Sequence, residues 1–203
     1  MAPQWLNDLA IAWVCTCAIC ALVLIALMLR RPPEMRIMSV VWPVTALYYG
    51  PVAVWAFFRA DPTFDSTTHC GAGCTLGDLI GESWVYAAGL TIGGSMLFAE
   101  YVVDFILAYI LGVAFQYFAI VPMRGLGLRD GITAALKADT LSLIAFELGL
   151  FGWMALTHYI LVPQATPASF AFWFMMQIGM IAGFWTSYPM NVLLLRWGIK
   201  EPM

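Results

Sequence analysis

Residues 83–123 read SWVYAAGLTIGGSMLFAEYVVDFILAYILGVAFQYFAIVPM and contain only two charged side chains, Glu100 and Asp104. As one helix, this stretch of about 40 residues would be about 60 Å long, twice the thickness of a bilayer core. Gly93 and Gly94 indicate a break in it. We therefore predict one membrane span over residues 103–122, preceded by an apolar helix over residues 84–98 that does not cross the membrane.

The positions of the basic residues support a single span here. With one span, only Arg59 of the nine Lys and Arg lies on the far side of the membrane. The side that carries the others is then cytoplasmic, because basic residues accumulate in cytoplasmic loops. These others are Arg30, Arg31, Arg36, Arg124, Arg129, Lys137, Arg196 and Lys200.

The composition is typical of a membrane protein. Hydrophobic residues make up 63% of the 203-residue chain and charged residues 10%, whereas soluble domains carry about 25% charged residues. Further spans are expected at residues 5–29, 37–58, 139–161 and 170–197. The sequence thus predicts an all-α integral membrane protein with about five transmembrane helices plus one non-spanning apolar helix, its N-terminus outside and its C-terminus inside.

The expected organisation has three parts. Residues 1–58 form two N-terminal transmembrane helices, residues 59–82 an extracytoplasmic Cys/His loop, and residues 83–203 a three-span domain. The N-terminus lacks the basic start of a removable signal peptide, so a multi-pass protein of the inner (cytoplasmic) membrane is expected. Its partner is the lipid bilayer, and the absence of a basic patch interleaved with aromatic residues argues against nucleic acid.

The densest cluster of potential metal ligands lies in the expected loop. His69, Cys70 and Cys74 fall within six residues, and Asp78 follows. Thiolate and imidazole together suit copper or zinc. A Cys70–Cys74 disulfide is the structural alternative, since extracytoplasmic cysteines are usually oxidised.

Other side chains are expected at the same membrane depth. Glu100 and Asp104 lie one turn apart at the outer end of the third span, with His158 and Met176 at the outer ends of the fourth and fifth. The sequence therefore predicts an extracytoplasmic metal site, with copper first and zinc or iron as alternatives. The simpler alternative for each residue is a solvated or packed side chain at the interface.

Polar residues also occur inside the expected spans. An ionised Glu147 would be costly there unless it is paired, protonated or in contact with water. It either hydrogen-bonds to Gln116 or takes part in a proton or ion relay that Asn191 could extend. The full set of intramembrane polar residues is Gln116, Glu147, Gln177 and Asn191.

The sequence also predicts helix packing at two glycines of the fifth span and helix capping at one acidic residue of the fourth. Gly179 and Gly183 allow close helix approach, either within the chain or in self-association. Asp139 is expected to cap the fourth span through its backbone amides.

The sequence resembles an uncharacterised membrane family, the domain of unknown function 4396 (DUF4396), over about residues 64–203. The resemblance implies a membrane protein and no particular activity. It rests mainly on His69-Cys70-Gly71-Ala72-Gly73-Cys74, Gly77-Asp78, Phe115-Gln116-Tyr117, Lys137-Ala138-Asp139-Thr140-Leu141-Ser142-Leu143, Phe146-Glu147 and Pro189-Met190-Asn191.

Four functions remain open at this point. The first is metal handling at the outer face. The second is a structural or accessory subunit of a larger membrane complex, stapled by the disulfide. The third is a membrane oxidase or oxygenase that uses Glu100, Asp104 and His158 as metal ligands. The fourth is a transporter that depends on Glu147.

Overall fold

The structure is a computed structural model and describes residues 3–33, 35–59 and 61–200. Within these ranges the chain is helical and forms no extended strand. The helices are α1 (Gln4–Arg30), α2 (Met38–Tyr49), α3 (Pro51–Phe57), α4 (Pro62–Ala88), α5 (Met96–Arg124), α6 (Leu128–Leu156), a π-helical turn η1 (Thr157–Leu161) and α7 (Phe170–Arg196).

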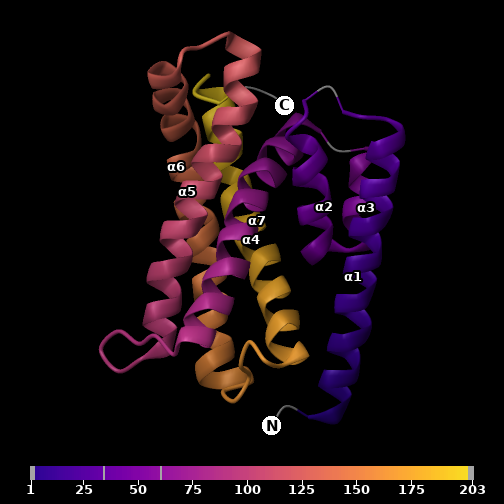
Figure 1. Ribbon diagram of the computed structural model, residues 1–203, viewed down its shortest axis with the longest axis vertical. Coiled ribbons are helices and arrows are strands. Elements are labelled where there is room, and N and C mark those ends of the chain that lie inside the picture. Colours follow the sequence, from indigo (N-terminus) through magenta and orange to yellow (C-terminus); the bar gives the residue numbers. More distant parts are fainter. Residues whose placement is uncertain (1–2, 34, 60, 201–203) are drawn as a thin grey trace.

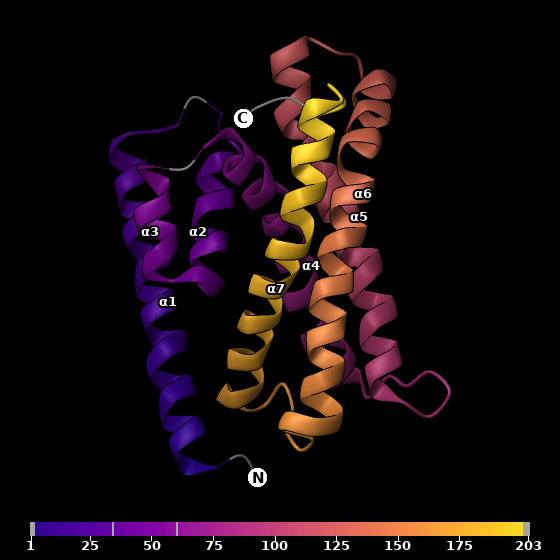
Figure 2. The ribbon, with the colours of Figure 1, turned by 180° about the vertical axis from the view of Figure 1, so that it is seen from behind.

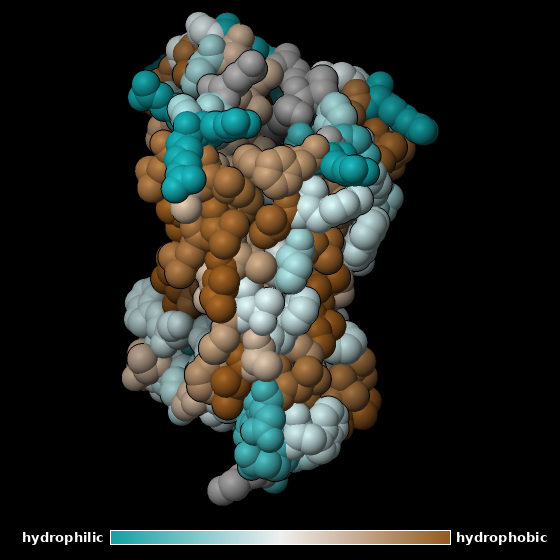
Figure 3. Space-filling view, turned by 90° about the vertical axis from the view of Figure 1, so that its right-hand side faces the viewer, coloured by the Kyte–Doolittle hydropathy of each residue, from teal (hydrophilic) through white to brown (hydrophobic). Residues whose placement is uncertain are grey.

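The long helices run side by side along one axis. α1, α4, α5, α6 and α7 each extend over most of the molecule, whereas α2 and α3 cover one half of it (Figure 1, Figure 2). By length and hydropathy, α1, α5, α6 with η1, and α7 could cross a membrane. An apolar surface belt separates hydrophilic ends, as the face containing α1 shows (Figure 3). The protein is therefore an all-α membrane protein.

The predicted Cys/His loop at residues 59–82 is wrong, because this segment forms most of α4. Asp61 begins the helix: its side chain accepts hydrogen bonds from the amides of Thr63 and Phe64, both at 2.9 Å. Pro62 takes the first helical position, where its missing N–H costs nothing. The helix then runs through the centre of the bundle, in contact with α2, α5, α6 and α7.

Glycines explain how a helix of such low hydropathy packs there. Gly73, Gly77 and Gly81 recur every four residues and form one face of α4 against α5. A Cβ on Gly73 would lie 2.6 Å from Cα of Gly112, and one on Gly77 would overlap the backbone of Ala108. This row of glycines lets the backbones of α4 and α5 touch. α4 can therefore lie deep in the bundle, where its polar residues are buried.

The predicted non-spanning helix at residues 84–98 is also wrong. α4 ends at Ala88 with a left-handed Gly89 (φ 63°), and Ser95 caps the start of α5. Between them the chain turns through Gly93 and Gly94, which both have positive φ. The break at these two glycines is thus confirmed, but it separates two long helices.

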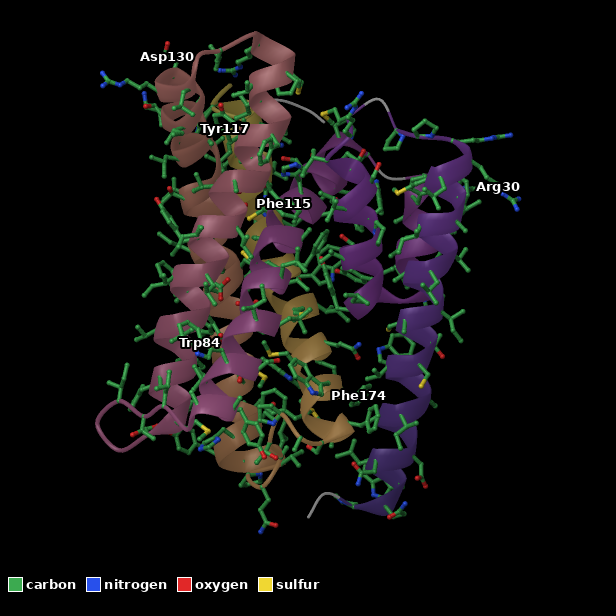
Figure 4. All side chains as sticks on the ribbon, viewed as in Figure 1. Arg30, Trp84, Phe115, Tyr117, Asp130 and Phe174 are labelled. Carbon is green, nitrogen blue, oxygen red and sulfur yellow. The ribbon has the colours of Figure 1, made fainter. Side chains whose placement is uncertain are left out.

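The predicted second span, residues 37–58, is a helical hairpin. α2 and α3 meet at Gly50, whose φ of 54° reverses the chain, and the turn lies near mid-height in the molecule (Figure 1). Arg59 therefore returns to the end where α1 stops, against the prediction. All nine Lys and Arg then lie in the same half of the bundle, and we call the end of this half the basic end. Arg30 lies there, as does the start of α6 at Asp130 (Figure 4).

The last two helices agree better with the sequence. α7 ends one residue before the predicted boundary, and Gly179 and Gly183 pack against α6 within the chain, as one of the two interpretations predicts. Self-association through them stays a prediction. α6 begins well before the predicted residue 139, with Gly127 at the N-cap position. Asp139 therefore does not cap the helix but lies inside it.

Candidate functional site

The interior of the bundle contains an unusual number of polar side chains. Helices α2, α4, α5, α6 and α7 contribute them, and most are fully buried. The acidic and basic ones, together with the two thiols of α4, are His69, Cys70, Cys74, Asp78 and Glu82 of α4, Glu100 and Asp104 of α5, Asp139 and Glu147 of α6, and Lys200 after α7.

A carboxyl cluster lies toward the end opposite the basic end. Glu82 of α4 lies close to both Glu100 and Asp104 of α5. Gly81 makes room for this contact, since a Cβ there would overlap Oδ1 of Asp104. Like charges so close together repel one another, which disfavours the ionisation of all three carboxyls at once.

A surface pocket gives access to this cluster. Its volume is about 110 Å³, and Glu100, Thr157 and His158 contribute polar groups to its lining. The π-helical turn η1 places Thr157 and His158 there at the end of α6. Glu100 is 6% exposed, so it connects the pocket with the buried carboxyls.

Two more carboxyls continue the cluster toward the middle of the bundle. Asp78 lies one turn before Glu82 on α4 and is an electrostatic neighbour of Glu82, Asp104 and Glu147. Glu147, on α6, lies beside the thiol of Cys74. Neither oxygen of Asp78 or Glu147 has a hydrogen-bond partner within the described part of the chain. Buried carboxyls of this kind are protonated or bind something not provided by the protein.

The two thiols lead on from Glu147. Cys74 is next to Cys70, one turn earlier on α4, and Cys70 is next to Asp139 of α6. Asp139 in turn lies 3.8 Å from Nζ of Lys200. Each titratable group thus has another one beside it, from Glu100 at one end to Lys200 near the other.

His69, Gln116 and Tyr48 surround this series. The imidazole of His69 is fully buried, packs edge-on against Phe115 at 6.1 Å and lies beside Gln116. The expected Glu147–Gln116 hydrogen bond is absent between these described residues, since neither Glu147 oxygen has a partner. Tyr48, from α2, places its hydroxyl 3.0 Å from where a Cβ on Gly71 would be, near both thiols.

The structure does not gather the predicted metal ligands at one rim. His69 and Asp78 are separated by about 13 Å along α4 at 1.5 Å per residue. His158 is exposed and lines a pocket with Glu100 at the end opposite the basic end, and Met176 packs in the apolar core. Among the described residues, no group of three or more His, Cys, Asp and Glu is arranged to hold a metal ion.

Cys70 and Cys74 form no disulfide. Both are free thiols inside α4, so the structure does not support the predicted disulfide. Of the remaining intramembrane polar residues, Gln177 donates a hydrogen bond to the carbonyl of Leu47 at 2.5 Å. Asn191 donates to Ser142 at 2.7 Å.

Sequence reasoning gave two contributors to the site no role in it. Lys200 was counted only among the basic residues of the cytoplasmic side, yet it is 1% exposed. Glu82 ended the predicted 59–82 loop and was not among the predicted metal ligands, yet it lies close to the carboxyls of α5. Its spacing of four from Asp78 places both side chains on one face of α4.

Comparison with known proteins places the chain in a family. The profile of DUF4396, a domain of unknown function, matches residues 61–200, so the chain belongs to this family, as the resemblance predicts. No curated protein and no solved structure matches the chain significantly.

Proposed function

We propose that this protein conducts protons across the inner (cytoplasmic) membrane through the polar interior of its bundle. The basic end faces the cytoplasm in this proposal, by the positive-inside rule, and α4 is a fifth crossing helix enclosed by the others. The observation that carries the proposal is the series of neighbouring titratable groups that extends through the interior from Glu100 to Lys200.

The charge distribution favours protons as the conducted species. Glu82, Glu100, Asp104, Asp78 and Glu147 lie in the bundle without a Lys or Arg beside them, because all nine basic residues belong to the other half. Charged carboxylates without counter-ions are very unfavourable at this depth. Protonation removes the charge, and a group that takes up and releases a proton there is suited to a relay.

The spacing along the series supports transfer in short steps. Asp78 and Glu82, like Cys70 and Cys74, are one helical turn apart on α4, a distance at which side chains on one face meet. Glu147 joins these two pairs from α6. A thiol can both donate and accept a proton, so the cysteines extend the route through a region without carboxyls.

Vesicles containing the purified protein test this proposal. In vesicles of phosphatidylcholine and phosphatidylglycerol that contain a pH-sensitive dye, a potassium gradient with valinomycin should drive proton uptake faster than in empty vesicles. We expect Glu147→Gln to slow this uptake at least about tenfold, because a positioned acid or base typically contributes more than that. Asp8→Asn, which removes an exposed carboxylate of α1, should not change the uptake.

Two results would contradict the proposal. Equal uptake by empty and protein-containing vesicles would exclude proton conduction under these conditions. Conduction that is unaffected by Glu147→Gln would exclude this route.

Metal binding remains a second proposal. The specific observation in its favour is that both ring nitrogens of the buried His69 lack a hydrogen-bond partner within the described chain, while the adjacent Cys70 is a free thiol. Copper is the first expectation, with zinc or iron as alternatives. Association with other membrane subunits, and an oxidase or oxygenase activity, stay predictions that no observation supports further.

A further inference from the structure

Lys200 is a buried cation held by oxygens from three other parts of the chain. Its Nζ donates to Oδ1 of Asn191 at 2.8 Å and to the carbonyl of Ser66 at 3.1 Å, and it lies 3.8 Å from Oδ1 of Asp139. These partners come from α7, α4 and α6. A buried ammonium group is very costly unless it is paired and hydrogen-bonded, so this cradle fixes a positive charge inside the bundle.

The chain after α7 is shaped to place this charge. Gly198 takes a left-handed conformation (φ 66°), and the amides of Ile199 and Lys200 both donate to the carbonyl of Leu194, at 3.0 and 3.2 Å. This is a typical glycine C-cap, and it directs the side chain of Lys200 back among the helices.

A second surface pocket lies just beyond this turn. Its volume is about 380 Å³, and its lining includes Gly198 and Ile199 together with Lys137 and Asp130 of α6. Lys200 therefore stands between the titratable series of the interior and a pocket at the basic end.

We propose that Lys200 restricts the pathway to protons by excluding metal and alkali cations at the basic end. This inference rests on the proposed proton conduction and specifies its selectivity. A proton can pass the site by exchange: the ammonium releases one proton to water in the pocket and takes another from the Asp139 carboxyl. A sodium or potassium ion cannot exchange in this way and would have to displace the ammonium from its three oxygens.

Electrostatics supports this assignment. A fixed positive charge repels any second cation that comes within contact distance, and the repulsion is strong where water is scarce. Fixed positive groups exclude cations from other membrane pores by the same principle. Without the ammonium, the oxygens of Asp139, Asn191 and Ser66 would form an anionic, oxygen-lined opening suited to an alkali cation.

Cation uptake by vesicles tests the inference. In the same vesicles, rubidium uptake should be at background with the wild-type protein and rise at least about tenfold with Lys200→Gln, since removal of the charge abolishes the repulsion. The double variant Lys200→Gln with Asp139→Asn should return uptake toward background, because no anion remains to attract the ion. Arg196→Gln removes an exposed charge from the same end and should behave as the wild type.

A further variant covers the case in which Lys200→Gln does not fold. Gly198→Val leaves all charges in place but strains the turn that positions Lys200, and should also allow rubidium uptake. If the wild type conducts protons and neither folded variant admits rubidium, the selectivity inference is wrong and proton conduction stands. If the wild type conducts no protons, the proposed function itself has failed.

Discussion

The close contact between α4 and α5 predicts a specific sensitivity at Gly73. In Gly73→Ala, the new methyl group would lie 2.6 Å from Cα and 2.8 Å from N of Gly112. These are backbone atoms and cannot rotate away. To reach an ordinary carbon–carbon contact the helices must separate by roughly 1 Å, and a gap of that size forfeits a quarter to a half of each dispersion contact along the interface.

The expected destabilisation follows from two opposing effects. Overpacking of this kind costs about 3 kcal/mol at the upper end of its usual range, whereas alanine is favoured over glycine by about 1 kcal/mol inside a helix. We therefore expect the free energy of unfolding to fall by about 2 kcal/mol, which corresponds to a loss of about 4–8 °C in Tm for a chain of this size.

Thermal unfolding in a mild detergent, followed by tryptophan fluorescence, measures this change. Gly152→Ala is the matched control. It lies on the exposed face of α6, where an added Cβ meets no atom within 4 Å, so its Tm should stay the same or rise. If Gly73→Ala melted at the wild-type temperature while the control behaved as expected, α4 and α5 would not be in backbone contact at this point.

Three further experiments test the arrangement. A reporter inserted after Arg59 in the full-length chain and one fused after Met203 should both be cytoplasmic, and one inserted at Gly93 should be exported. An exported reporter at Arg59 would contradict the hairpin. With the cysteines of α1 replaced by alanine, Cys70 and Cys74 should resist a maleimide in the folded protein and react after denaturation. Rapid labelling of the folded protein would instead place them in an exposed loop. Protein purified without chelator should contain close to one equivalent of copper, zinc or iron if the metal proposal is correct, and less than about a tenth of an equivalent would end it.

The apolar helices were predictable because a long run of apolar residues is enough to indicate a membrane-spanning helix. Both α1 and α7 agree with the predicted spans to within one residue at each end. α4 was missed because its sequence has the opposite character: glycine, threonine and acidic residues suggest a surface loop when considered alone. The glycines of α4 pack against the small residues Gly112 and Ala108 of α5. Sequence spacing does not reveal which helices pack together, so this contact could not be predicted.

The candidate site was predictable by residue type but not by position. The sequence indicated Cys70, Cys74, Glu100, Asp104 and Glu147, and all five line or adjoin the buried series. It placed the cysteines at the membrane surface because the hairpin was interpreted as a full span, which reversed the side on which residues 59–82 begin. One wrong crossing thus turned a buried series of titratable residues into an apparent surface metal site.

The α2–α3 hairpin also constrains how the protein is made. Each arm is too short to cross a bilayer: α2, with 12 residues, extends about 18 Å. Its tip at Gly50 rests on Cys17 of α1, with Sγ 3.1 Å from where a Cβ would be, and Gln177 of α7 donates to Leu47 beside it. Because unsatisfied backbone groups are not tolerated against lipid, the hairpin cannot reach its final depth before α7 has been synthesised. α2 and α3 therefore reach their final positions only after α7 has been synthesised, although they precede it in the chain. Chains truncated before α7 should be degraded by the cell.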